Sequence, residues 1–345
     1  MKRIIAAVSA LTITAACFAS CGSKKDDTKS EKATEATTEA VTTAEETTEA
    51  AETTTEAEEE KDDEENYDTG DASLDNIRNQ DEIGDNELLV ISFGTSFNDS
   101  RRLTIGAIED ALEKSFPEYA VRRGFTANIV IDHVAKRDGV LIDDIDAALK
   151  RAVDNGVKNL VVQPTHLMNG LEYEEVTGKI AEYSDAFEKV AIGEPLLTSD
   201  DDFAKVEKAI TDWTKEYDDG ETAICFMGHG TEADSNAVYQ KMQDLLTKDG
   251  FANYYVGTVE AEPSVEDVLE KVKAGNYKKV ILEPLMVVAG DHANNDMAGD
   301  EEDSWKSVFE AEGYEVKCLL RGLGENEDIQ SIYVDHAQKA IDSIK

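Results

Sequence analysis

The sequence is poor in basic residues: it has 34 Lys and Arg against 75 Asp and Glu, and its net charge is −41. The stretch from Asp26 to Asp71 contains 19 acids and three lysines, which supply −16 of that charge and leave −25 elsewhere. Nucleic acids and anionic membrane surfaces attract basic proteins, so this balance argues against both as partners. A cation is the more natural ligand.

Cysteine is scarce, and several catalytic motifs are missing. Of the four cysteines, Cys225 and Cys318 lie inside apolar, strand-like runs, and we interpret them as small core residues because no spacing indicates a disulfide. The chain has no Walker sequence, no GxGxxG, no GxSxG and no HExxH. The usual sequence evidence for nucleotide-binding enzymes, serine hydrolases and zinc peptidases is therefore absent, and no organic cofactor is expected.

The other two cysteines stand in an N-terminal export signal, residues 1–21. Two basic residues precede an apolar run, and small residues precede Cys21, so the segment resembles a bacterial lipoprotein signal that is cleaved before Cys21 and lipidated on its thiol. Cys17 is the weaker candidate. The apolar run is shorter than the ~20 residues that a membrane-spanning helix needs, so we expect attachment to the membrane through the lipid.

Residues 22–86 follow as an acidic segment rich in Thr, Glu and Ala. This segment has almost no apolar side chains to bury and its like charges repel, so we predict a disordered tether. The protein is accordingly expected to be extracytoplasmic and lipid-anchored to the bacterial cell membrane.

From about Glu87 the pattern alternates between short apolar strands and amphipathic helices. The predicted strands, each followed by a helical pattern, are LLVISF, NLVVQP and KVAIGE and, after Gly220, AICFMG, YYVGTV, KVILEPLMVV and VKCLLR. Continuous apolar strands separated by helices predict parallel sheets covered on both faces. We therefore expect an α/β protein with two such lobes, at 87–197 and 198–345.

The two lobes also resemble each other in sequence. KNLVVQPTHLMNGLEY aligns with KKVILEPLMVVAGDHA at a constant offset of 120, which places Glu172 opposite His292. Likewise SFGT aligns with GHGT, which places Phe93 opposite His229. These matches indicate a duplication, and the aligned residues follow strands, where open parallel sheets bind their ligands.

Three strand ends in the second lobe carry side chains that can bind a metal. His229 lies between two glycines after AICFMG, Glu260 follows YYVGTV, and His292 follows KVILEPLMVV. Two imidazoles and one carboxylate form a three-ligand set that leaves coordination positions open and suits Co²⁺, Ni²⁺, Fe²⁺ or Zn²⁺. A structural role is the alternative for His229, since buried polar groups are often simply paired.

Carboxylates near these strand ends are further candidates. Glu172 begins a helix, where the helix dipole favours a carboxylate in any case, but its position opposite His292 makes it a candidate site residue. Asp291 and Asp296 can orient His292, and we expect Asp300 to cap the following helix.

The three other histidines are less specific. His166 also follows a strand and is a candidate of second rank. His133 and His336 lie on helical patterns, and we expect them to be surface or core residues.

A group of arginines stands out in so acidic a chain. Guanidinium groups bind carboxylates or phosphates in a forked geometry, which allows an anionic substrate, although ion pairs on helices explain them equally well. The group comprises Arg101, Arg102, Arg122, Arg123 and Arg137.

From about Leu88 to Ile344 the chain resembles the anaerobic cobalt chelatases, which insert Co²⁺ into sirohydrochlorin on the early-insertion route to cobalamin. The resemblance rests on SFGTSFNDSRRLTIGAIE, RRGFT, RDGV, VVQPTHLMNGLEYEEV, FMGHGTEADSNAVY, VGTVEAEPS and MVVAGDHANNDMAGDEEDSWKS. It implies two lobes of the class II chelatase type, facing each other across a cleft. The N-terminal signal and tether depart from the family pattern.

The resemblance also implies roles for individual residues. By motif, the family's active-site histidines correspond to His229 and His292, its active-site glutamate to Glu172, and its additional metal-binding glutamate to Glu260. Arg101 and Arg102 are candidates to bind the carboxylates of the macrocycle.

The implied activity is that of a lyase that inserts a divalent metal into a tetrapyrrole outside the cytoplasmic membrane. Co²⁺ is the first expectation for the metal substrate, with Ni²⁺, Fe²⁺ or Zn²⁺ as alternatives. The alternative function is a non-catalytic surface lipoprotein that binds metal, haem or a corrinoid for uptake. A homo-oligomer is compatible with the sequence.

Overall fold

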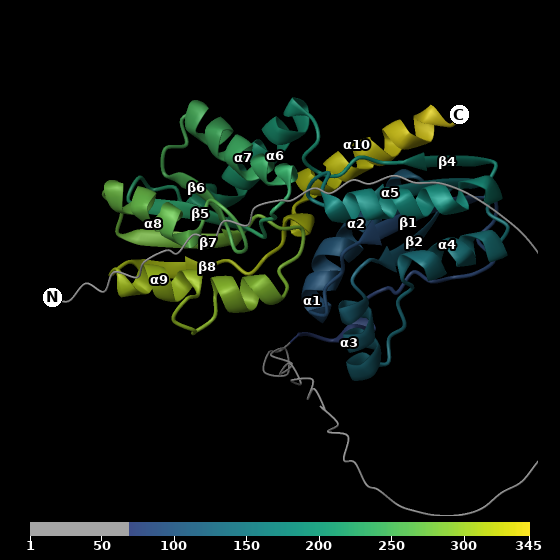
Figure 1. Cartoon of the computed structure of the whole chain (residues 1–345), viewed down its shortest axis with the longest axis horizontal. Coiled ribbons are helices and arrows are strands. Elements are labelled where there is room, and N and C mark those ends of the chain that lie inside the picture. Colours follow the sequence, from purple (N-terminus) through teal and green to yellow (C-terminus); the bar gives the residue numbers. More distant parts are fainter. Residues whose placement is uncertain (1–68) are drawn as a thin grey trace, which may run out of the picture. The chain divides into compact units, whose positions relative to one another are not determined.

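The computed structural model describes residues 69–345, so the predicted signal, Cys21 and most of the predicted tether lie outside the described residues. The described part contains two four-stranded parallel sheets flanked by helices (Figure 1). The predicted α/β fold with two similar lobes is confirmed. Within residues 69–345, none of the helices combines the length and the apolar character needed to cross a membrane.

The first lobe has the strand order β2-β1-β3-β4. Its strands are β1 (Asn86–Ser92), β2 (Ala120–Phe125), β3 (Asn159–Pro164) and β4 (Lys189–Ile192), and its helices are α1 (Asn98–Arg101), α2 (Ala107–Ser115), α3 (Asn128–Asp138), α4 (Ile145–Asp154) and α5 (Leu171–Tyr183). Leu89 and Ile91 of β1 pack with α4 and α5, whereas Leu88 and Val90 pack with α2 on the other face. Because successive side chains of a strand point to opposite faces, a continuously apolar strand fills both cores.

The second lobe repeats this plan with the strand order β6-β5-β7-β8. Its strands are β5 (Thr222–Gly228), β6 (Tyr254–Thr258), β7 (Lys279–Pro284) and β8 (Glu315–Cys318). The helices of this half of the chain are α6 (Asp200–Thr214), α7 (Ala237–Lys248), α8 (Val265–Ala274), α9 (Trp305–Ala311) and α10 (Glu327–Ser343). Short helical segments are η2 (Ala72–Leu74), η3 (Arg102–Gly106), η4 (Ser184–Ala186), η5 (Lys215–Tyr217), η6 (Asp234–Asn236), η7 (Ala293–Met297) and η8 (Leu323–Glu325), of which η3 and η7 are π-helical.

Backbone hydrogen bonds confirm the repeat at the strand ends. Beyond β1, the Ala127 N–H donates to the Phe93 carbonyl at 3.2 Å, and beyond β5 the Glu260 N–H donates to the His229 carbonyl at 2.8 Å. The two lobes therefore share the same local backbone where the predicted site lies. The side chains differ at these positions, and the two histidines occur in the second lobe.

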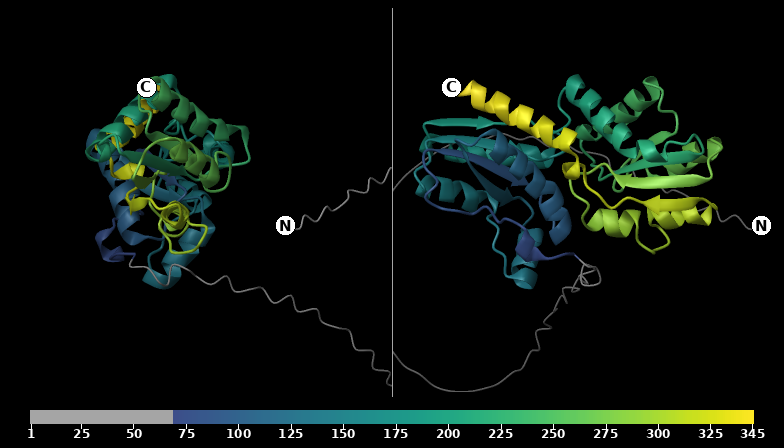
Figure 2. Two further views of the ribbon diagram at one scale, coloured as in Figure 1. Left: turned by 90° about the vertical axis from the view of Figure 1, so that its left-hand side faces the viewer. Right: turned by 180° about the vertical axis from the view of Figure 1, so that it is seen from behind.

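The C-terminal helix departs from the predicted division into lobes. α10 packs against α2, β3 and β4 of the first lobe (Figures 1 and 2). Its buried Tyr333 donates a hydrogen bond to the Thr165 carbonyl at 2.8 Å. The predicted second lobe at 198–345 is therefore wrong at its end, because α10 completes the core of the first lobe.

Residues 71–86 also differ from the prediction, which assigned them to the disordered tether. Asp75 is buried and binds Arg101 at 2.7 Å and Arg123 at 2.6 Å. Arg78 is buried as well and lies 3.2 Å from Glu109 of α2. Buried charges require partners, so this segment belongs to the first lobe although its composition resembles that of the tether.

Candidate metal and substrate site

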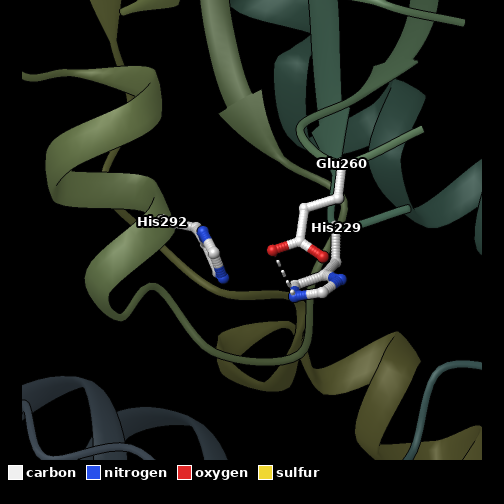
Figure 3. Close-up of side chains that lie close together, drawn as sticks. All are labelled: His229, Glu260 and His292. Atoms are coloured by element: carbon white, nitrogen blue, oxygen red, sulfur yellow. Dashed lines mark ion pairs between the residues drawn. The ribbon is translucent and has the colours of Figure 1, made fainter. Parts of the chain in front are cut away.

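Three side chains converge at the carboxyl ends of the second sheet. His229 follows β5, Glu260 lies beyond the end of β6, and His292 precedes η7 (Figure 3). One donor atom from each lies within 4.8 Å of the other two. The two imidazole centroids are 4.7 Å apart and the rings are inclined at 85°. The structure thus brings together the three residues that the sequence singled out, and their role as ligands stays a prediction.

Hydrogen bonds orient both imidazoles. The Nδ1 of His229 lies 2.8 Å from the Gly230 carbonyl, and the Nδ1 of His292 lies 2.7 Å from Asp296 Oδ2. A neutral imidazole whose Nδ1 faces an acceptor carries its proton there, so Nε2 keeps its lone pair. Both Nε2 atoms can therefore bind a cation. The hydrogen bond to Asp296 also raises the pKa of His292 above its usual value, against the opposing effect of burial.

The site is open to ligands and rich in negative charge. The side chains of His229, Glu260 and His292 are 46%, 55% and 33% exposed. Glu260 Oε1 lies 3.9 Å from His229 Nε2, and Asp291 and Asp296 add further carboxylates beside His292. Three protein ligands with open positions are the arrangement of sites in which a bound metal still exchanges other ligands.

The glycine after His229 lets two strand-end loops approach each other. Gly230 has φ +91°, which other residues rarely adopt, and a Cβ at this position would lie 2.8 Å from the Ala261 nitrogen. A side chain here would push apart the loops that carry His229 and Glu260. The second glycine of GHG is therefore explained by packing at the site.

The first lobe contributes Glu172, which interacts electrostatically with His229. Glu172 lies on the first turn of α5, and partial burial raises the pKa of its carboxyl while nearby His229 opposes that rise. Strand-end loops of the two lobes approach closely here, because a Cβ on Gly170 would lie 3.2 Å from Ser235 Oγ. The structure thus brings Glu172 near the three-residue cluster, while the cleft expected between the lobes stays a prediction.

Arg101 cannot receive a substrate carboxylate, contrary to the prediction. Its side chain is fully buried, and its guanidinium donates to Asp75, to Asn98 and to a backbone carbonyl. The prediction failed because the partner Asp75 lies in a segment assigned to the tether. Arg102 is 35% exposed and pairs with Asp99 at 3.1 Å, so it stays a candidate for substrate binding.

The other arginines also take part in ion pairs or backbone contacts. Arg122 is fully buried and binds Glu87 at 3.2 Å and Asp143 at 3.0 Å. Arg123 is likewise fully buried between acids. Arg137 binds Asp138 and a backbone carbonyl. Ion pairs therefore account for Arg122, Arg123 and Arg137, although Arg122 and Arg123 lie on strand β2 and not on a helix as expected.

His336, the two cysteines of the second half and Asp300 lie outside this cluster. His336 is a core residue that contacts Asp202 at 3.1 Å, as allowed by the sequence. Cys225 is buried and Cys318 half-buried, and both are free thiols. The predicted capping role of Asp300 is wrong, since Ser304 caps α9 and Asp300 pairs with a lysine.

The sequence of the chain is similar to that of known proteins of one family. The family model described as cobalt chelatase (CbiK) matches residues 86–342. A sirohydrochlorin cobaltochelatase from Salmonella typhimurium is 36% identical over 254 residues, which cover 74% of this chain and 96% of the relative. The sirohydrochlorin cobaltochelatase CbiKC of Nitratidesulfovibrio vulgaris is 28% identical over 281 residues, covering 79% and 97%.

A solved structure supports the fold. The structure of SirB from Bacillus subtilis with Fe³⁺ is similar with a TM-score of 0.55 at 11% identity, and the match covers 75% of this chain and 97% of that one. At this identity the likeness concerns the arrangement of the two lobes and nothing finer.

Proposed function

Because the chain belongs to the cobalt chelatase (CbiK) family, we propose that it inserts Co²⁺ or a similar divalent metal into sirohydrochlorin or a related tetrapyrrole. The observation that carries the proposal is the convergence of His229, Glu260 and His292 within 4.8 Å. The orientation of both imidazoles, with Nδ1 bonded to an acceptor, supports it further. As a member of this family, the protein is an enzyme of the chelatase type, which is a kind of lyase.

The metal is a substrate in this reaction, and the three side chains would hold it until the macrocycle binds. Insertion requires that the ion lose bound water and that two pyrrole N–H protons be removed. Glu172 of the other lobe interacts electrostatically with His229, and its raised pKa brings its carboxyl closer to the working range of a general base. A histidine that has released the metal regains a free Nε2 and serves as the second base.

A direct test follows the visible spectrum of sirohydrochlorin on addition of Co²⁺ and the protein. We expect a Co²⁺-dependent change that His229→Ala abolishes, because the substitution removes one of two nitrogen ligands. His133→Ala on α3 is the matched control and should keep full activity. Normal turnover by His229→Ala would contradict the assigned role.

The donor set does not select one metal. Two imidazole nitrogens and a carboxylate suit several borderline divalent ions, so Co²⁺ comes first by family and Ni²⁺, Fe²⁺ and Zn²⁺ follow. Product analysis after incubation with each metal and with several tetrapyrroles identifies the pair that reacts fastest. Insertion of Co²⁺ slower than that of all the others would contradict the first choice.

Arg102 is the proposed contact for a carboxylate of the macrocycle. Its guanidinium is partly exposed on η3 and has only Asp99 as an ion-pair partner among the described residues. Arg102→Gln should raise KM for the macrocycle with little change in the affinity for Co²⁺. An unchanged KM would remove Arg102 from the substrate site.

We further propose that the protein acts outside the cytoplasmic membrane, held by a lipid on Cys21. The support is the signal-like sequence of residues 1–21 with small residues before the cysteine. Metabolic labelling with a tagged fatty acid should mark the wild type in the membrane fraction and leave Cys21→Ser unlabelled. An unprocessed, unlabelled wild-type chain would contradict the anchor.

The same N-terminal sequence favours a second candidate function, a surface lipoprotein that binds metal, haem or a corrinoid for uptake without catalysis. Calorimetry with Co²⁺ and with haem, run beside the insertion assay, separates the two. Tight binding without insertion would favour the carrier, and multiple turnovers would favour the enzyme. A homo-oligomer stays a prediction that light scattering on the purified chain tests.

A further inference from the structure

His166 is a buried imidazole without a hydrogen-bond partner among the described residues. It follows β3 at the end of the first sheet, and its side chain is 6% exposed. Neither ring nitrogen makes a hydrogen bond. Its Nε2 lies 3.7 Å from Oε2 of Glu172, which is slightly beyond hydrogen-bond distance. Because a buried polar group without a partner is costly, its presence here calls for a reason.

The second lobe shows that this position does not need a histidine for packing. The backbone hydrogen bonds after β3 and β7 match, with the Thr165 and Leu285 N–H groups each donating to the adjacent central strand, at 2.9 and 2.7 Å. The next residues, His166 and Met286, are therefore equivalent. A methionine fills the place in the second lobe, and the imidazole occurs in the lobe that carries Glu172.

The backbone of His166 is fixed by hydrogen bonds, whereas the side chain of Glu172 is free to rotate. The His166 carbonyl accepts a hydrogen bond from the Leu196 N–H at 3.0 Å, and the Tyr333 hydroxyl lies 3.4 Å from it. Glu172 sits on the first turn of α5 with 53% of its side chain exposed. A small rotation of the Glu172 side chain therefore closes the gap, while His166 stays in place.

We propose that His166 is a positioning residue whose Nε2–H donates to the carboxylate of Glu172 and holds it toward the macrocycle. This inference rests on the proposed function, in which Glu172 is a base. Apo structures often show such hydrogen bonds lengthened, and they tighten when substrate binds.

The burial of His166 suits this role. Burial lowers the pKa of His166 to about 4, so its ring is neutral at neutral pH. A neutral donor orients a carboxylate without the large drop in basicity that an adjacent cation would cause. It also adds no positive charge beside the incoming metal ion.

The test compares His166→Met, which carries the residue of the repeat, with His166→Gln, which keeps an N–H donor. We expect His166→Met to lower kcat about 10- to 100-fold through misplacement of the base, with KM for the macrocycle and the Kd for Co²⁺ nearly unchanged. His166→Gln should retain most of the activity. Equal losses in both variants would overturn the proposal.

A double-mutant cycle separates positioning from general damage to the fold. In a Glu172→Gln background, His166→Met should have no further effect on kcat, since there is no carboxylate left to orient. A further loss of the same size as in the wild type would show that His166 acts on something else.

The pKa of Glu172 can be measured without catalysis, so it tests the positioning role of His166 separately from the proposed function. The Glu172 carboxyl can be titrated by NMR in the metal-free full chain with sirohydrochlorin bound, where Glu175 and His229 also face it and are retained in every variant. Its pKa should be higher in His166→Met than in the wild type or His166→Gln, because a hydrogen bond to the charged form is lost. Identical titrations would overturn the positioning role, whereas failure of the wild type to insert metal would overturn the function alone.

Discussion

Asp296 determines which nitrogen of His292 faces a ligand. Its carboxylate binds Nδ1 at 2.7 Å and sits one turn further along η7. The Gly230 carbonyl does the same for His229. Single hydrogen bonds thus orient both imidazoles, and in the proposed function they do so before the cation binds.

Asp296→Asn should weaken Co²⁺ binding about 10- to 100-fold, because the amide no longer fixes the tautomer and the ring orientation as the carboxylate does. Calorimetry on the purified chain measures the effect. Asp300→Asn is the control, since Asp300 pairs with Lys306 and not with His292. Equal affinities for wild type and Asp296→Asn would contradict the orienting role.

The strand β2 is unusual because arginines occupy its interior. Arg122 and Arg123 are adjacent and both fully buried, and their partners come from β1, α2, the segment before β1 and the loop before α4. Two charges in the middle of AVRRGF break the apolar pattern by which strands are recognised. For this reason β2, which forms one edge of the first sheet, could not be predicted from the sequence.

Removing Asp75 should destabilise the first lobe by about 3–5 kcal/mol, since Arg101 and Arg123 would each lose a buried partner. Urea unfolding of Asp75→Ala measures the loss. Asp85→Ala is the matched control, because Asp85 forms an exposed pair with Lys158. Similar stabilities of the two variants would mean that the segment before β1 contributes little.

A buried ion pair ties β7 to the chain after β8. Glu283 is 1% exposed in its side chain and binds Arg321 at 2.6 Å, and the Arg321 guanidinium stacks on Trp213 at 3.8 Å. Burial raises the pKa of Glu283 to about 7, although Arg321 opposes the rise.

This pKa predicts a pH dependence of stability. Between about pH 4.3, the usual value for glutamate, and pH 7 the folded chain holds more protons than the unfolded chain, so the contribution of Glu283 to stability falls as pH rises. The difference in unfolding free energy between wild type and Glu283→Gln should therefore decrease from pH 5 to pH 8. An increase would show that attraction to Arg321 outweighs burial.

The two halves of the chain share one core. One apolar cluster includes strands of both sheets together with α6 and α10. α10 follows the last strand of the second sheet but packs on the first lobe, so the core of the first lobe is completed only by this helix.

Tyr333→Ala should lower the stability of both lobes together, by about 3–5 kcal/mol for a fully buried aromatic side chain. Both tryptophans, Trp213 and Trp305, lie in the second half of the chain, whereas Tyr333 packs toward Thr165 in the first lobe. The tryptophan fluorescence and circular dichroism transitions should therefore shift equally in urea. A fluorescence transition that stays in place would mean that the lobes unfold separately.

The sequence predicted the repeated plan and the three clustered side chains because both depend on local patterns: apolar strands, and polar residues directly after them. It could not predict contacts between distant segments. The burial of Arg101 depends on Asp75, which lies in a stretch whose composition is typical of disordered segments. The position of α10 depends on which apolar surface of the two lobes the other helices leave uncovered. One feature of the sequence pointed to the pair of His166 and Glu172: the equivalent of His166 in the second lobe is Met286, so the histidine is specific to the lobe that carries Glu172.

The donors of the cluster all come from one lobe, and Glu172 comes from the other. In the proposed function, binding of the metal ion therefore requires only the second lobe, whereas removal of the ring protons requires both lobes. We therefore expect the metal ion to bind before the macrocycle, and metal insertion to begin only when the macrocycle binds.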